Sequence, residues 1–85
     1  MSRVERLKRQ VNEAGVPLRE LSRLSKNFIR TGVAYYRISD GLNECVKLSD
    51  AEIDALETAL ALALQTRVDH FSRLLSEYPL QQATA

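Results

Sequence analysis

The chain has 85 residues, of which 45% are hydrophobic and 27% are charged, and its formal net charge is +1. So short a chain allows only one domain. Its apolar fraction excludes a wholly disordered chain, and its near-neutral charge excludes a simple polycation.

The charges are distributed unevenly along the chain. Residues 1–41 carry nine Lys/Arg and four Asp/Glu, a formal charge of +5, whereas residues 42–85 carry three and seven, a formal charge of −4. A basic half can lie on a polyanion while the acidic half faces away from it, so this asymmetry favours a nucleic-acid partner.

The first predicted element is a helix over residues 3–14. Apolar residues recur at intervals of three or four between Val4 and Ala14, which places them on one helical face. Ser2 suits the N-cap position, with an acid three residues later. Gly15 suits the left-handed residue that commonly follows a last helical turn.

A second helix is predicted over residues 17–25. Pro17 suits the first turn of a helix, and Leu18 and Leu21 follow at helical spacing. Because only two or three residues join this helix to the first, we expect the two to pack at an angle.

Residues 26–41 allow two interpretations. In one, a single helix spans 27–39 and tolerates Gly32. In the other, a loop precedes a shorter helix that Thr31 caps and that ends at the same residue. The second is favoured because Thr is a good N-cap and the preceding Lys-Asn pair is typical of a turn. In both, Asp40 and Gly41 end the helix.

The remaining chain is predicted to be a loop and one long helix. Residues 42–48 have no clear period, and Cys45 is expected to lie half-buried among them. Residues 49–52 (Ser-Asp-Ala-Glu) form a capping-box pattern. An apolar stripe then continues at helical spacing, which predicts a helix over 50–78 or two helices that meet near 65–66.

These elements predict an all-α single domain of four to five helices. Its core is expected over residues 3–64, its C-terminal helical extension over 65–78 and a flexible tail over 79–85. The most apolar run, residues 59–64, is too short to span a bilayer, and residues 1–10 do not resemble a signal peptide. A single cysteine fits the reducing cytoplasm, which is the expected location.

Three segments carry a family resemblance. Residues 18–25 (LRELSRLS) resemble the first motif helix of phage repressor and Cro-like regulators, residues 31–41 (TGVAYYRISDG) resemble their recognition helix with its closing glycine, and residues 48–56 (LSDAEIDAL) resemble their fourth helix. The resemblance covers about residues 3–64 and implies a lambda-repressor-like helix-turn-helix domain. The connection over 26–30 is one or two residues longer than the family's tight turn.

The resemblance also implies a DNA-binding surface. In such domains the second motif helix lies in the major groove and the first crosses the phosphate backbone. Arg30, Ala34 and Arg37 would share the base-facing side of the recognition helix. The residues expected to contact DNA are Arg19, Arg23, Lys26, Asn27, Arg30, Thr31, Ala34, Tyr35 and Arg37.

Ordinary structural roles remain open for several of these residues. Arg19 and Arg23 could form a solvated helix face, and Arg37 could pair with Asp40. Tyr36, beside the expected contacts, is predicted to lie in the core.

Catalysis is not expected. The sequence has no glycine-rich phosphate loop and no nucleophile beside a plausible base. His70 has no second residue at convincing metal-ligand spacing. We therefore predict no enzyme activity, no cofactor, no metal and no small-molecule substrate.

The second half of the long helix is expected to form an interface. Its apolar stripe has little left in the chain to cover it, although folding back on the first helix is an alternative. A twofold homodimer would suit a palindromic operator. The residues expected at the interface are Leu64, Val68, Phe71, Leu74, Leu75 and Tyr78.

Two functions follow as hypotheses. The first is a sequence-specific, DNA-binding transcriptional regulator, a dimeric repressor of the phage or plasmid type. The alternative is a small helical adaptor or inhibitor that docks on another protein through its C-terminal apolar helix.

Overall fold

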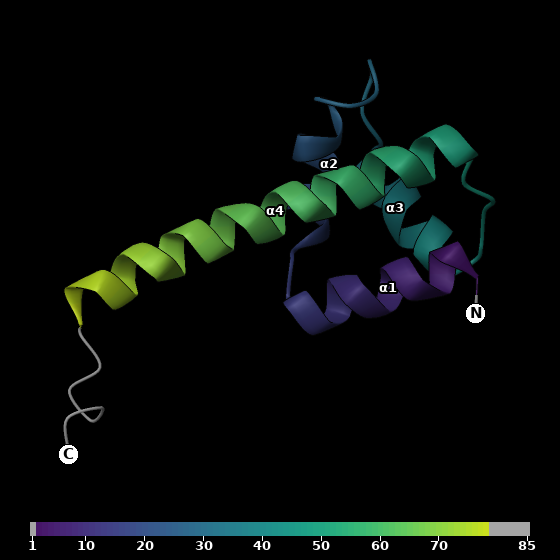
Figure 1. The fold of residues 1–85 in the computed structure, drawn as a ribbon. Coiled ribbons are helices and arrows are strands. Elements are labelled where there is room, and N and C mark those ends of the chain that lie inside the picture. Colours follow the sequence, from purple (N-terminus) through teal and green to yellow (C-terminus); the bar gives the residue numbers. More distant parts are fainter. Residues whose placement is uncertain (1, 79–85) are drawn as a thin grey trace.

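The computed structural model describes residues 2–78, which form four helices and no strand (Figure 1). The helices are α1 (Arg3–Ala14), α2 (Leu18–Ser25), α3 (Tyr35–Leu42) and α4 (Asp50–Glu77). The all-α prediction with a long C-terminal helix is confirmed. The tail predicted over 79–85 lies outside the described residues.

Local capping explains where α1 begins and ends. The Ser2 hydroxyl accepts a hydrogen bond from the Glu5 amide at 3.1 Å. Gly15 adopts φ +67°, and its amide donates to the Val11 carbonyl at 3.0 Å. A residue without a side chain adopts this left-handed conformation at little cost, so both predicted ends of α1 are confirmed.

The start of α4 has the predicted capping box. The Ser49 hydroxyl accepts from the Glu52 amide at 3.1 Å, and the Glu52 carboxylate accepts from the Ser49 amide at 2.9 Å. From there α4 continues without a break past residues 65–66 to Glu77, so the two-helix alternative is wrong. None of the helices among the described residues combines the length and apolarity that a bilayer crossing requires.

The core forms where α1 and α2 pack on the first half of α4 and α3 packs on α1 and α2. Figure 1 shows these three helices gathered on that half, while the second half of α4 extends beyond them. The largest completely buried side chains are Leu7, Leu21, Val33, Ile38 and Leu56, one or more from each helix and one from the α2–α3 connection. Packing on α4 therefore sets the position of α2, and packing against α1 and α2 sets the position of α3.

The segment between α2 and α3 differs from both interpretations of the sequence. Residues 26–34 form a nine-residue connection, and α3 begins only at Tyr35. Thr31 does not cap a helix, because its hydroxyl lies 3.4 Å from the carbonyl of Gly32. Gly32 has φ +69°, a conformation that a right-handed helix cannot contain.

Two serines of α2 hold the end of this connection. The Ser25 hydroxyl accepts from the Val33 amide at 2.8 Å, and the Ser22 hydroxyl donates to the Val33 carbonyl at 2.7 Å. A Cβ added to Gly32 would lie 2.7 Å from Cγ of Lys26. The chain is therefore bound to α2 at Val33, and a helix cannot start before it has left that position.

The predicted end of α3 is also wrong. The helix continues through Asp40 and Gly41 to Leu42, since Gly41 is a packing residue rather than a stop signal. A Cβ at Gly41 would lie 2.5 Å from Cγ of Leu48. After the helix, Glu44 takes the left-handed conformation with φ +61°, and Cys45 is exposed rather than half-buried.

Candidate nucleic-acid interface

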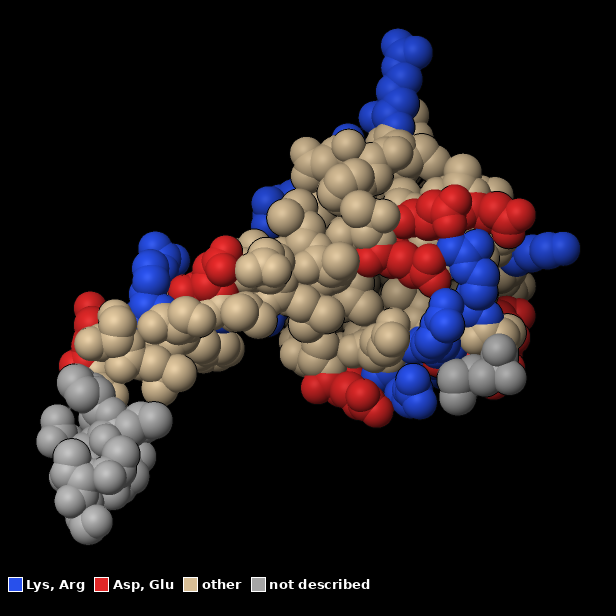
Figure 2. All heavy atoms as spheres, in the orientation of Figure 1, with Lys and Arg blue, Asp and Glu red and all other residues tan. Residues whose placement is uncertain are grey.

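The basic side chains at the start of α1 are paired with the acidic start of α4. Arg3 donates to Asp54 at 2.5 Å and to Glu57 at 2.6 Å, and Arg6 lies 3.8 Å from Glu57. Figure 2 shows these oppositely charged groups in contact over α1 and the beginning of α4. Acids from the acidic half of the sequence therefore neutralise some of the bases in the basic half, so the folded protein is less asymmetric in charge than its sequence.

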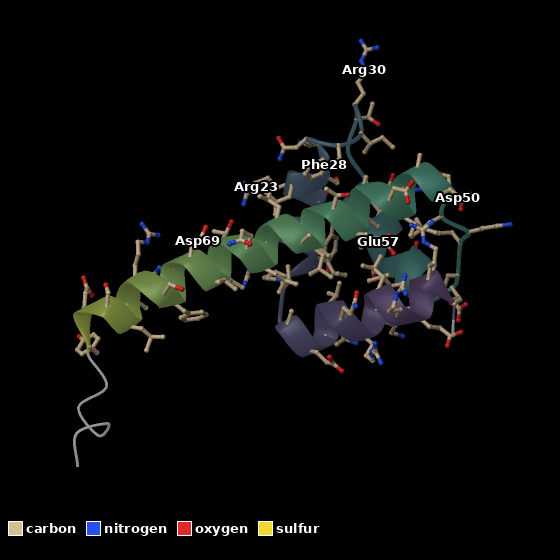
Figure 3. The ribbon with its side chains drawn as sticks, in the orientation of Figure 1. Arg23, Phe28, Arg30, Asp50, Glu57 and Asp69 are labelled. Atoms are coloured by element: carbon tan, nitrogen blue, oxygen red, sulfur yellow. The ribbon has the colours of Figure 1, made fainter. Side chains whose placement is uncertain are left out.

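A second group of basic side chains has no such partners. Arg19, Arg23, Lys26 and Arg30 are exposed, and none forms a salt bridge with an acid among residues 2–78. They lie on α2 and on the connection that follows it. Figure 3 shows Arg30 extending away from the body of the protein, with Phe28 and Arg23 on the α2 side of it. We call these four residues the α2 cation group.

The one acid of α2 is bound by an arginine of α4. Glu20 lies between Arg19 and Arg23 in sequence, but it accepts two hydrogen bonds from Arg67 of α4, at 2.8 and 3.1 Å. These bonds lower the pKa of the Glu20 carboxyl. The outward face of α2 is thereby left with cations, and α2 is fixed to the middle of α4.

The first turn of α3 lies beside the α2 cation group. The Arg19 guanidinium is 5.5 Å from the centre of the Tyr35 ring, a cation–π contact that joins the two helices at the surface. Ala34 precedes the helix and provides no side-chain cap. The first amides of α3 therefore have no capping side chain, and such amides attract anions.

Tyr36 is exposed, not part of the core as predicted. It is 71% exposed because α3 buries its opposite side, formed by Ile38, Gly41 and Leu42. Asp40 is also exposed and lies one turn after Tyr36. The outer face of α3 therefore presents two aromatic rings and one carboxylate.

Arg37 has a structural role that the sequence did not indicate. Its Nε and one terminal nitrogen donate to the two carboxylate oxygens of Glu52, at 2.5 and 2.9 Å. The alternative of a pair with Asp40 is therefore not realised. These hydrogen bonds hold the pKa of Glu52 at about 2, below its ordinary value of 4.5, and they fasten α3 to the start of α4.

The structure thus separates the predicted DNA contacts into residues that are exposed and residues that have a structural role. The alignment of Arg30, Ala34 and Arg37 on one helical face is wrong, because Arg30 precedes α3 and Ala34 is its N-cap. The Asn27 amide donates to the Leu24 carbonyl at 3.1 Å, at the end of α2. Arg19 and Tyr35 are in contact, and the other exposed predicted residues follow on α2 and the connection: Arg23, Lys26, Asn27, Arg30, Thr31 and Ala34.

Two surface aromatics were missed by sequence reasoning. Tyr36 could have been placed only by knowing that α3 starts after Gly32. Phe28 is also exposed, on the connection between α2 and Arg30. Its position after a Lys-Asn pair typical of turns was the available signal.

The predicted interface residues of α4 are exposed in the single chain. Val68, Phe71, Leu75 and Tyr78 are all more than half exposed, and Leu64 and Leu74 are partly so. Folding of this stripe onto α1 is therefore wrong. Separately, the described residues contain no group of three or more His, Cys, Asp or Glu side chains that could hold a metal ion.

Comparison with known proteins adds no relative: no family model, no curated protein and no solved structure matches this chain. The resemblance to helix-turn-helix regulators therefore remains a prediction that rests on the residues of this sequence.

Proposed function

We propose that the protein binds double-stranded DNA through the α2 cation group and the first turn of α3, and that it acts as a transcriptional regulator, a cytoplasmic repressor of the phage or plasmid type. The observation that carries the proposal is the selective pairing of its basic residues. Arg3, Arg6, Arg37 and Arg67 are engaged by carboxylates, whereas the four cations of α2 and the connection form no salt bridge with an acid among residues 2–78. The other exposed cations without a salt bridge there, Lys8, Lys47 and Arg73, lie on other elements.

Phosphate binding would use the α2 cation group. Each phosphate that a Lys or Arg neutralises releases condensed counterions, so the logarithm of affinity falls by about 0.9 per contact per decade of salt. Four contacts predict a slope of about −3.6, or a loss of roughly 100-fold between 50 and 200 mM salt. This salt dependence distinguishes DNA binding from docking on an apolar protein surface.

Base contacts would come from α3. An α-helix fits the major groove, and residues near the N-terminus of a recognition helix face the base edges. Tyr35 and Tyr36 occupy that turn, and Asp40 lies one turn further along. A carboxylate can accept from the amino group of cytosine, but it repels phosphates, so we expect Asp40 to contribute to sequence choice rather than to affinity.

The connection differs from the tight turn of the helix-turn-helix domains that the sequence resembles. It replaces a tight turn with nine residues and carries Arg30 and Phe28 outward. Because Val33 is bound to Ser22 and Ser25, the connection joins α3 at a fixed position. We expect Arg30 to reach a phosphate beyond the groove that α3 occupies.

The test is enrichment of bound sites from random-sequence duplexes, followed by titration of the selected site at two salt concentrations. We expect Arg30→Ala to weaken binding by about tenfold, because hydrogen bonds to charged groups contribute about 1.5–3 kcal/mol. The combined variant Arg19→Ala, Arg23→Ala and Arg30→Ala should abolish site-specific binding. The salt slope should become less steep by about one for each cation removed.

Arg73→Ala is the matched control. Arg73 is an exposed arginine without a salt bridge among the described residues, but it lies near the end of α4. Its removal changes the net charge by the same amount as Arg30→Ala and should leave affinity within about twofold. No enrichment, or equal losses in both variants, would contradict the proposal. The exposed apolar face of α4 would then favour the second candidate, an adaptor that docks on another protein.

A further inference from the structure

The second half of α4 is an apolar surface that no other part of the described chain covers. Phe71 is 58% exposed, Leu75 is 59% exposed and Tyr78 is 72% exposed. All residues from 68 to 78 are exposed, and Figure 1 shows this part of α4 extending past the other helices. A stripe of large apolar side chains held in water is unfavourable unless a partner removes it from water.

The spacing of this stripe is that of a coiled-coil seam. Leu64, Val68, Phe71, Leu75 and Tyr78 are separated by 4, 3, 4 and 3 residues. This 3.5-residue repeat is the pattern of a helix that packs against another helix along its length, with these residues at the d, a, d, a and d positions. The seam contains two heptads.

The exposed seam continues the buried stripe of α4 into the part of the helix that extends beyond the other helices. In the first half, Ile53, Leu56 and Leu60 face the core. Phe71 follows Leu60 by eleven residues, about three helical turns, so the two side chains lie on nearly the same face of the helix. The seam is uncovered because α4 extends past α1, α2 and α3, so only a partner outside the described chain can cover it.

The charges around the seam suit a second copy of this chain. The flanking e and g positions hold Gln65, Ser72 and Leu74, which are neutral, and Arg67, whose guanidinium is bonded to Glu20. The ionised residues of this region, Asp69, Arg73 and Glu77, occupy the b, f and c positions, on the side opposite to the seam. Two identical helices therefore meet along the seam without repulsion between like charges.

No other described helix could serve as the partner. The apolar faces of α1, α2 and α3 are already buried in the core, through Leu7, Leu21 and Ile38 among others. The one remaining helix face with a matching heptad seam is the same segment in another molecule.

We infer that residues 64–78 pair with the same residues of a second copy, as a two-heptad coiled coil that makes the protein a homodimer. The inference rests on the seam alone and does not require DNA. If the proposed function also holds, the dimer carries two α2 cation groups related by a twofold axis, which suits a palindromic site.

The test is sedimentation equilibrium of the full chain in the absence of DNA. We expect a mass of twice 9.6 kDa at about 100 µM that falls toward 9.6 kDa on dilution, because association of this kind depends on concentration. Phe71→Asp combined with Leu75→Asp should give a monomer at every concentration. Thr66→Asp, which adds one acid on the opposite face, should remain dimeric.

A second measurement separates loss of pairing from loss of folding. Phe71 and Leu75 are exposed in the single chain, so the double variant should keep the cooperative unfolding of the α1–α4 core. In a Cys45→Ser background, Phe71→Cys should form an intermolecular disulfide on mild oxidation, whereas Arg73→Cys should not. A wild-type chain that is monomeric at about 100 µM, or a double variant that remains dimeric, would overturn the inference. DNA binding by a monomer would overturn it without affecting the proposed function.

Discussion

The two halves of α4 carry the same kind of apolar stripe in opposite surroundings. In the first half, Leu56 and Ala59 are completely buried in the core; in the second half, Phe71 and Leu75 lie in solvent. Both halves are helical because neither contains a glycine or proline and a capping box starts the whole element. Periodicity thus predicts the helix but does not identify what covers its apolar face.

The largest expected difference between the two halves is in the free energy of unfolding when one leucine of each half is truncated. We expect Leu56→Ala to lower the free energy of unfolding by about 3 kcal/mol, because it leaves a cavity in the core. Leu75→Ala should change it by less than about 0.5 kcal/mol at a concentration where the chain is monomeric. Urea denaturation of both variants measures the difference. Equal losses would show that the second half is packed in solution.

A smaller difference in the free energy of unfolding should distinguish a polar contact in the first half of α4 from one in the second half. Glu52→Gln removes the charged partner of Arg37 and weakens the capping box, so we expect a loss of about 1–2 kcal/mol in the free energy of unfolding. Asp69→Asn is the control, because the Asp69 carboxylate bonds only to the exposed Gln65, at 2.9 Å. Its effect should stay within about 0.5 kcal/mol. A neutral Glu52→Gln variant would contradict the role given to the Arg37 pair.

The same glutamate should make stability depend on pH. The pKa of Glu52 is about 2 in the folded protein and near its ordinary 4.5 when the chain is unfolded. A group whose folded pKa is lowered stabilises the fold above its unfolded pKa, and this stabilisation is lost as the pH falls from about 4.5 to about 2. Thermal unfolding across that range should show a smaller decline in Glu52→Gln than in the wild type. Identical profiles would assign the decline to other carboxylates.

A second comparison, between α1 and α2, bears on the candidate site. The two helices are similarly basic in sequence, yet Arg3 of α1 is bonded to Asp54 and Glu57, whereas Arg19 and Arg23 of α2 have no carboxylate partner in the described chain. Composition therefore could not distinguish a structural arginine from one that is available to a ligand. The decisive partners lie about fifty residues away in sequence.

Some of the fold could be predicted because it depends on neighbouring residues. The boundaries of α1 and the start of α4 follow from a serine, an acid three residues later and a glycine, all within one or two helical turns. The α2 cation group was likewise named from the sequence, although its availability was not.

The start of α3 and the role of Arg37 could not be predicted in this way. The hydrogen bonds of Val33 to Ser22 and Ser25 cross eleven and eight residues, and the pairing of Arg37 with Glu52 crosses fifteen. Thr31 is a better N-cap residue than Ala34, the actual N-cap of α3. The local sequence therefore favours a helix that begins too early.

The sequence by itself determined which segments are helical and where most of them begin and end, because capping and periodicity act over three to seven residues. Only the tertiary structure decided which cations are paired, where α3 starts and which half of α4 is buried. Those outcomes depend on side chains that are distant in sequence and meet only when the helices pack, so no local pattern contains them.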